Sequence, residues 1–74
     1  MPEKANGQYR ELSAREREVI ALAAQGKTAR GIGAILGITK RTVDAHSRTA
    51  ARKLGATNKT QAVALAVGHG IVNV

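Results

Sequence analysis

Helix-capping residues and glycines alternate along most of this 74-residue chain. Ser13 and Glu16 have the S-x-x-E spacing of a capping box, in which two side chains satisfy exposed backbone N–H groups at a helix start. Later residues suited to capping a helix start are Thr28, Thr39 and Asn58, the last with Gln61 three positions on. Glycines, which favour the left-handed backbone at a helix end, follow as Gly26, Gly37, Gly55 and Gly70. The alternation predicts four helices: from Ser13 to Gly26, after Thr28, over residues 40–54, and from Asn58 to about His69.

Apolar residues recur at helical spacing inside these segments and indicate a small shared core. The first segment contributes Val19, Ile20, Leu22 and Ala23, and the second contributes Ile32, Ile35 and Leu36. In the third segment, Val43, Ser47, Ala50 and Leu54 mark a core-facing side, and Arg41, Ala45, Arg48 and Arg52 mark the opposite side. Gly31 and Gly33 each weaken the second helix by roughly 1 kcal/mol relative to Ala, so we expect another helix to cross closely there.

The net charge of +7 is concentrated in the middle of the chain. Residues 1–26 contain four basic and four acidic side chains, and residues 60–74 contain neither kind. Residues 27–59 contain eight Lys or Arg side chains against the single carboxylate of Asp44, which accounts for the whole excess. A cationic segment of this kind indicates a polyanionic partner. The alternative is a solvated basic face that serves solubility.

Length and composition exclude several classes of function. A chain of 74 residues forms one small domain and leaves no room for an enclosed cofactor cavity, so no cofactor is expected. There is no Cys for a disulfide or a zinc site, and a single Tyr cannot provide an aromatic platform for bases. The sequence has no apolar run of membrane-spanning length and no signal peptide. We therefore expect a soluble, cytoplasmic protein without a membrane partner.

No catalytic or metal site is expected. Glu16 and Glu18 are the one carboxylate pair to consider for acid–base catalysis, but they lie at a capped helix start without a nucleophile nearby. His46 is expected to pack inside the third helix, and His69 is expected to lie at a helix end near carbonyl groups. Two histidines without further ligands do not predict a metal centre.

Residues 21–28, ALAAQGKT, resemble a loosened phosphate-binding loop of nucleotide-binding proteins. Such a loop follows a strand and turns its backbone N–H groups toward phosphate. Here the residues before Gly26 belong to the first expected helix, and the first position of the motif is Ala21 rather than Gly. We interpret Gly26-Lys27-Thr28 as a joint between two helices, with Lys27 and Thr28 at a helix start where a DNA phosphate can bind.

A short helix, a tight turn at Gly37-Ile38 and a longer basic helix together predict a helix-turn-helix unit. Motifs along residues 12–72 then resemble the LuxR/GerE/NarL-type DNA-binding domain. In order, they are LSAREREV at 12–19, GKT at 26–28, LGIT at 36–39, TV at 42–43 with His46, KLG at 53–55 and NKTQAV at 58–63. The resemblance implies an all-α, four-helix bundle-like helix-turn-helix domain over residues 12–74. The polar residues 1–11 are expected to form a flexible arm or linker.

The resemblance also implies that the second helix crosses the DNA phosphates and the third enters the major groove. By motif position, Asp44, Ala45 and Arg48 would face bases. Arg48 can hold guanine O6 and N7 together, and Ala45 can touch a thymine methyl group. Asp44 fits two roles, accepting from a cytosine amino group or favourable placement near a helix N-terminus. The phosphate-contacting candidates are Lys27, Thr28, Thr39, Lys40, Arg41, Thr42, Arg52 and Lys53, of which Arg52 also fits base contact.

The fourth expected helix is apolar on all sides over residues 62–67, which exceeds what one core-facing stripe requires. Ala62, Val63 and Ala66 are expected to face the core. The resemblance implies that this helix forms a dimer interface, with Ala64, Leu65 and His69 toward the partner. A two-fold dimer would read two half-sites about ten base pairs apart. The alternative is an apolar helix that remains monomeric.

Together these features predict a sequence-specific regulator of bacterial transcription that binds double-stranded DNA as a homodimer, with RNA polymerase as a candidate second partner. The chain is either a free-standing regulator or the output domain of a longer one. A promoter-recognition module of the sigma-factor region 4 kind shares the fold, but the tail over residues 53–63 argues against it. A cationic peptide for membrane surfaces or protein partners is the alternative from another class, and the capped order of helices argues against it. An enzyme is not expected.

Overall fold

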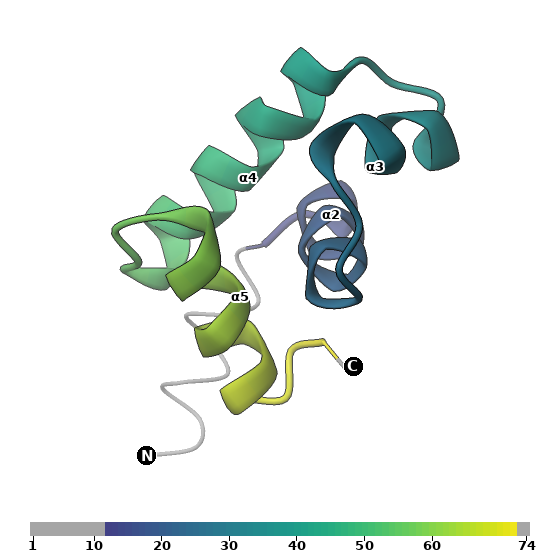
Figure 1. The fold of residues 1–74 in the computed structure, drawn as a ribbon. Helices are drawn as coiled ribbons and strands as arrows, with labels where there is room; N and C mark the ends of the chain where they lie inside the picture. Colours follow the sequence, from purple (N-terminus) through teal and green to yellow (C-terminus); the bar gives the residue numbers. More distant parts are fainter. Residues whose placement is uncertain (1–11, 73–74) are drawn as a thin grey trace.

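The computed structural model describes residues 12–72, which form four helices (Figure 1). The helices are α2 (Ala14–Ala24), α3 (Ala29–Leu36), α4 (Lys40–Leu54) and α5 (Lys59–Gly68). No strand occurs in this part of the chain, so the expected all-α fold is confirmed. None of these helices is long and apolar enough to cross a membrane. The arm expected over residues 1–11 lies outside the described residues.

The helix starts are capped as the sequence predicts. Ser13 Oγ accepts a hydrogen bond from the Glu16 N–H at 3.0 Å, and Glu16 Oε1 accepts one from the Ser13 N–H at 3.0 Å. Thr28, Thr39 and Asn58 each accept from the backbone N–H three residues ahead. The cap of α5 differs in one detail, because the Gln61 side chain accepts from the N–H and hydroxyl of Thr57 instead of completing a capping box with Asn58. Gln61 Oε1 thus accepts two hydrogen bonds from Thr57, whereas in a capping box it would accept one from the backbone of Asn58.

The core consists of two adjoining clusters of buried side chains. One joins α2, α3 and α4 through Val19, Ala29, Ile32 and Val43. The other joins α2, α4, α5 and the segments that flank the helices, through Leu12, Ile20, Ala50, Ala51, Leu54, Ala62, Ala66 and Val72. The predicted inward side of α4 is correct, since Val43, Ser47, Ala50 and Leu54 are all buried. Helix α4 therefore contributes to both clusters and packs against each of the other three helices.

Ile35 was expected in the core, and this expectation is wrong. Its side chain is 56% exposed, whereas Ile32 is fully buried and Leu36 is half-buried. Successive helix positions are about 100° apart, so Ile35 and Leu36 lie on opposite flanks of Ile32. The eight-residue α3 packs against α2 and α4. These neighbours cover Ile32 and part of Leu36 but leave the flank that carries Ile35 exposed.

The close approach expected at Gly33 exists, but the neighbour is a turn rather than another helix. A Cβ atom on Gly33 would lie 2.5 Å from the carbonyl oxygen of Ile38. The Ile38 N–H donates to the Gly33 carbonyl at 2.9 Å, so the turn after α3 folds back directly onto this residue. At Gly31 the nearest atom to such a Cβ is Thr28 Oγ1 at 3.3 Å, which belongs to the cap of the same helix. Gly33 thus allows the tight turn that sets α4 against α3.

Glu16 connects the start of α2 to the end of α4. Besides capping α2, its Oε1 atom accepts a hydrogen bond from Lys53 Nζ at 3.0 Å, and the Glu16 side chain is only 8% exposed. Burial by itself raises the pKa of the Glu16 carboxyl, but the hydrogen bond from Ser13 and the Lys53 ammonium more than offset burial and hold the pKa below its usual value. The charged carboxylate is therefore the favoured state in the fold.

We expect Gly33→Ala to lower the free energy of unfolding by about 1–3 kcal/mol, because the added methyl group collides with backbone that can move only by opening the turn. Urea denaturation measures this change. Gly68→Ala is the matched control, since a Cβ at Gly68 meets nothing within 4 Å. The control should be neutral or stabilising by up to about 1 kcal/mol. Equal stabilities for the two variants would contradict the tight-turn account.

We expect Glu16→Gln to lower the free energy of unfolding at pH 7 by about 1–3 kcal/mol, through loss of a charge-assisted hydrogen bond to Lys53. Because the folded-state pKa of Glu16 lies below the unfolded value, this stabilisation is present above the ordinary carboxyl pKa of 4.5 and disappears as pH falls through the lower folded value. Urea denaturation from pH 7 to pH 3 should therefore show a shallower acid loss for Glu16→Gln than for the native chain. Glu18→Gln is the control, because Glu18 pairs with Arg15 on the exposed surface.

Candidate nucleic-acid interface

The side of α4 opposite the core is exposed along its whole length. Arg41, Ala45, Arg48 and Arg52 are all exposed, as the spacing of these residues predicts. Within residues 12–72 the carboxylates of Glu16, Glu18 and Asp44 are each already held in an ion pair. The three arginines on this side of α4 form no ion pair in the described part of the chain, although the charge of Arg48 contributes to lowering the pKa of the Asp44 carboxyl. Their charge is available to an external anion.

The start of α4 carries a hydroxyl pair and an ion pair. Thr39 caps the helix by accepting from the Thr42 N–H, and the two threonine hydroxyls lie 3.0 Å apart. Lys40 Nζ donates to Asp44 Oδ2 at 2.8 Å, and this hydrogen bond holds the pKa of the Asp44 carboxyl below its usual value. Asp44 thus has a partner one turn earlier on its own helix. Both roles expected for Asp44 remain compatible with this geometry, since the ion pair is exposed to solvent.

The ALAAQGKT segment is a joint between α2 and α3. Gly26 has a φ of 90°, and the N–H groups of Gly26 and Lys27 donate to the carbonyls of Ala23 and Leu22 at 3.0 and 3.2 Å. A phosphate-binding loop requires its backbone N–H groups to point together toward a bound phosphate. Here the two N–H groups donate to carbonyls of α2 instead. Lys27 and Thr28 are exposed at the start of α3, where Thr28 caps the Gly31 N–H.

Two of the predicted phosphate-contacting residues, Arg52 and Lys53, differ in their surroundings although they are neighbours in sequence. Arg52 is exposed. The ammonium group of Lys53 is held by the buried Glu16, and its side chain is 31% exposed. Lys53 therefore has a structural role that sequence reasoning missed, because Glu16 lies 37 positions away. Its contact with phosphate remains a prediction.

The residues expected at a dimer interface do not all share one environment. Ala64 and His69 are exposed, whereas Leu65 is half-buried and packs against the core. Val67, which was not among the expected interface residues, is 37% exposed and lies one turn after Ala64. The spacing of Ala64, Val67 and Gly68 at i, i+3 and i+4 could have identified this exposed apolar face. A partner that covers it remains a prediction.

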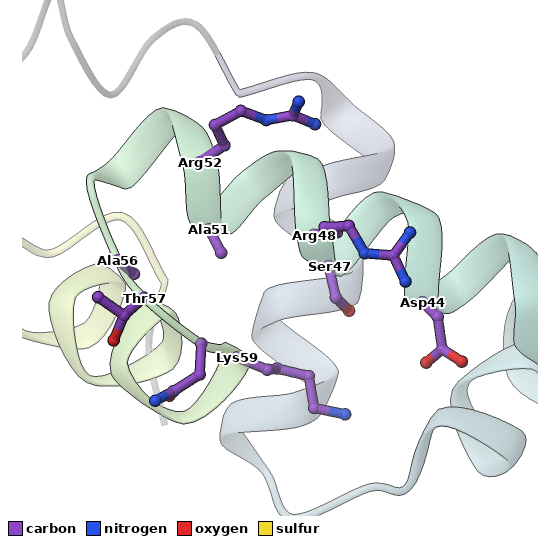
Figure 2. A pocket seen from close by; sticks show the side chains of 9 residues that line it. Asp44, Ser47, Arg48, Ala51, Arg52, Ala56, Thr57 and Lys59 are labelled. Atoms are coloured by element: carbon purple, nitrogen blue, oxygen red, sulfur yellow. The ribbon is translucent and has the colours of Figure 1, made fainter.

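A groove runs between α4 and the start of α5 (Figure 2). Its lining residues are Asp44, Ser47, Arg48, Ala51, Arg52, Ala56, Thr57, Asn58 and Lys59. Two of the predicted base-facing residues, Asp44 and Arg48, lie along it. Ser47, Thr57 and Lys59 were not singled out as site residues, because their proximity depends on how α5 packs against α4. The groove therefore joins the exposed side of α4 to the first turn of α5.

Comparison with solved structures supports this arrangement of helices. The structure of the transcription factor GerE superposes with a TM-score of 0.78 at 29% sequence identity. The match covers 84% of this chain and 92% of the GerE chain. The four helices and their order are therefore those of the GerE fold.

Sequence comparison finds close relatives among bacterial regulators. Transcriptional activator protein BjaR1 of Bradyrhizobium diazoefficiens is 63% identical over 62 residues, which cover 84% of this chain and 26% of the relative. Transcriptional activator protein SolR of Ralstonia nicotianae is 51% identical over 61 residues, covering 82% and 26%. The quorum sensing-dependent transcriptional regulator RpaR of Rhodopseudomonas palustris is 54% identical over 61 residues, covering 82% and 25%. The chain spans about a quarter of the length of these relatives.

The family model described as bacterial regulatory proteins, luxR family, matches residues 10–66. This range includes nearly all of the four helices, the exposed side of α4 and the groove beside it. The chain belongs to the luxR family of bacterial regulatory proteins and is a DNA-binding transcription regulator domain of the helix-turn-helix type.

Proposed function

We propose that this domain reads a specific sequence in double-stranded DNA by placing α4 in the major groove. The observation that carries the proposal is the two-sided character of α4, which buries one side in the core and exposes three arginines and Ala45 on the other. An α-helix with its side chains is about as wide as the major groove of B-form DNA. The exposed side is thus suited in both shape and charge to that groove.

Within this proposal, Arg48 is the principal base-reading residue. It is exposed halfway along α4, and its guanidinium group can donate two hydrogen bonds to guanine. Ala45, one turn earlier, suits a thymine methyl group, and Asp44 suits a cytosine amino group when it leaves Lys40. The starts of α3 and α4 contact phosphates through Lys27, Thr28, Thr39, Lys40, Arg41 and Thr42, with Arg52 and Lys53 at the far end of α4. These contacts fix the register of the domain on the duplex.

We further propose that α5 pairs with its copy in a two-fold dimer. Ala64 and Val67 form an apolar exposed face on α5, with His69 at its end, in a domain too small to cover this face itself. Two copies related by a two-fold axis would present their α4 helices to half-sites about ten base pairs apart. Because the aligned region makes up only about a quarter of each relative, we propose that this chain acts as the output domain of a longer regulator that contacts RNA polymerase.

Selection from a random pool of duplexes at near-physiological salt tests sequence reading directly. We expect recovery of a two-fold symmetric motif. Arg48→Ala should then weaken binding to the selected duplex by about 1–3 kcal/mol and relax the preference at one base pair of each half-site. Arg17→Ala is the control, because Arg17 is exposed on α2 and lines a hollow with Ile71 and Val72 that is separate from α4. Recovery of no motif, with binding that only weakens as salt rises, would refute the proposed base contacts.

Ala64→Lys tests the dimer. The substitution places a charge on the exposed face of α5 without removing a core contact, and its positive sign excludes simple repulsion from DNA. We expect a loss of cooperative binding to a full two-fold site, with affinity for an isolated half-site maintained, as measured by gel-shift titration. Gln25→Lys, at the exposed end of α2, adds the same charge away from α5 and should leave cooperativity intact. Unchanged cooperativity in Ala64→Lys would rule out this face as the interface.

A further inference from the structure

The groove between α4 and α5 contains an unpaired hydroxyl group. Ser47 is 5% exposed and lines the groove, and its Oγ atom is buried without a hydrogen-bond partner in the described part of the chain. A buried hydroxyl without a hydrogen-bond partner lowers the stability of the fold. Figure 2 shows the Ser47 side chain leaving α4 on the side where Lys59 lies. The hydroxyl therefore lies on the Lys59 side of α4 but is shielded from solvent, so an acceptor reaches it only when the covering side chains shift.

The opposite wall of the groove is the first turn of α5. Asn58 caps this ten-residue helix, and Lys59 is its first residue. The first N–H groups of a helix have no carbonyl partners within the helix, and the helix dipole adds positive potential at this end. The N–H of Gln61 already donates a hydrogen bond to Asn58 Oδ1. The ammonium of Lys59 adds a full charge at the same place.

Two further observations indicate an anion rather than a neutral acceptor. Lys59 also lines a smaller hollow together with Gly26 and Lys27, so the cations of the α2–α3 joint and of α5 border adjoining surfaces. Asp44, the one acidic residue in the groove, is neutralised by Lys40 at 2.8 Å. In Figure 2 the Asp44 and Ser47 side chains leave α4 at separate points, and Arg52 extends away from Lys59. The end of the groove with Lys59 and Ser47 therefore contains a cation, and the one carboxylate in the groove is already paired.

We infer that this end of the groove binds one phosphate of the DNA backbone, with Lys59, the first turn of α5 and Ser47 as its ligands. The inference rests on the proposed placement of α4. A helix that fills the major groove has a phosphate backbone on each side, and the structure beside the exposed side of α4 at Arg48 is the start of α5. The phosphate accepts from Lys59 and the α5 N–H groups, and from Ser47 once the side chains that cover its hydroxyl shift.

The test compares three variants on duplex DNA between 50 and 200 mM salt. Removing one phosphate contact lowers the salt slope of log K by about 0.9. Lys59→Gln should therefore lose affinity on every duplex, and the loss should be about threefold larger at 50 mM than at 200 mM salt. Arg17→Gln, which removes the same charge from α2, should keep the native slope. Ser47→Ala should weaken DNA binding while its stability in urea stays equal or rises, because the substitution removes an unsatisfied hydroxyl.

Two further arms identify the source of the phosphate. In one arm, each duplex carries a single neutral methylphosphonate in place of one phosphate. At one position per half-site, this replacement should lower the DNA affinity of the native chain but cause no further loss of affinity in Lys59→Gln. Amide NMR titration with inorganic phosphate against chloride, at constant ionic strength, reports the site without DNA. Shifts at Lys59 and Thr60 without any such methylphosphonate position would overturn the inference in favour of a free-phosphate site.

The inference and the proposed function fail in different ways. Equal salt slopes for Lys59→Gln and Arg17→Gln, or an unchanged affinity for Ser47→Ala, would overturn the phosphate site even if the native chain selects a clear motif. A native chain that selects no motif but loses salt slope on Lys59→Gln would overturn sequence reading and support the phosphate site. This separation is possible because phosphate contacts act on every duplex, whatever its sequence.

Discussion

Helix α4 has to bury one side against three other helices and still leave its opposite side bare. In a domain of this size α4 contributes to both core clusters, so neither cluster would be complete without its buried side. Val43 and Leu54, at its two ends, are buried in different clusters, so α4 is held along its full length. The tight turn at Gly33 fixes its start, and the ion pair between Lys53 and Glu16 fixes its end. A rigid α4 presents its exposed side chains at defined positions, as base reading requires.

Electrostatics follow from the same arrangement. Every carboxylate within residues 12–72 is already paired, two of them with cations of the basic middle segment. The remaining cations of that segment repel one another in the free domain, which lowers its stability and strengthens its attraction to a polyanion. Of the two paired cations, Lys40 pairs within α4, whereas Lys53 holds α4 to α2 through Glu16. Positive charge thus stabilises the packing of α4 at Lys53 and attracts a polyanion elsewhere, and the structure is needed to tell which residue does which.

The sequence predicts the helices of this fold well, because caps and glycine stops are local signals. Ser13 with Glu16 and the threonines at 28 and 39 act within a single turn, so their roles follow from spacing alone. Non-local features could not be predicted in this way. The ion pair of Glu16 with Lys53 joins residues 37 positions apart. The exposure of Ile35 depends on which flank of α3 its neighbours cover, and periodicity does not specify that.

The candidate site also has a part that follows from local sequence and a part that depends on non-local packing. The exposed stripe of α4 was predictable because one helix carries all of it, and its periodicity sets one side against the other. The groove was not predictable, because Ser47 lies at a position that periodicity assigns to the core and Lys59 belongs to another helix. Only the packing of α5 against α4 brings the two together.

Helix α5 connects DNA contact to assembly under the proposed function. Its first turn borders the groove, and its exposed apolar face begins at Ala64, five residues after Lys59. At 1.5 Å per residue, these positions are about 7.5 Å apart along the axis. A dimer formed through α5 would therefore hold the two phosphate sites and the two α4 helices in one rigid spacing. Any influence that alters the pairing of α5 would change affinity for a full site without changing the residues that read bases.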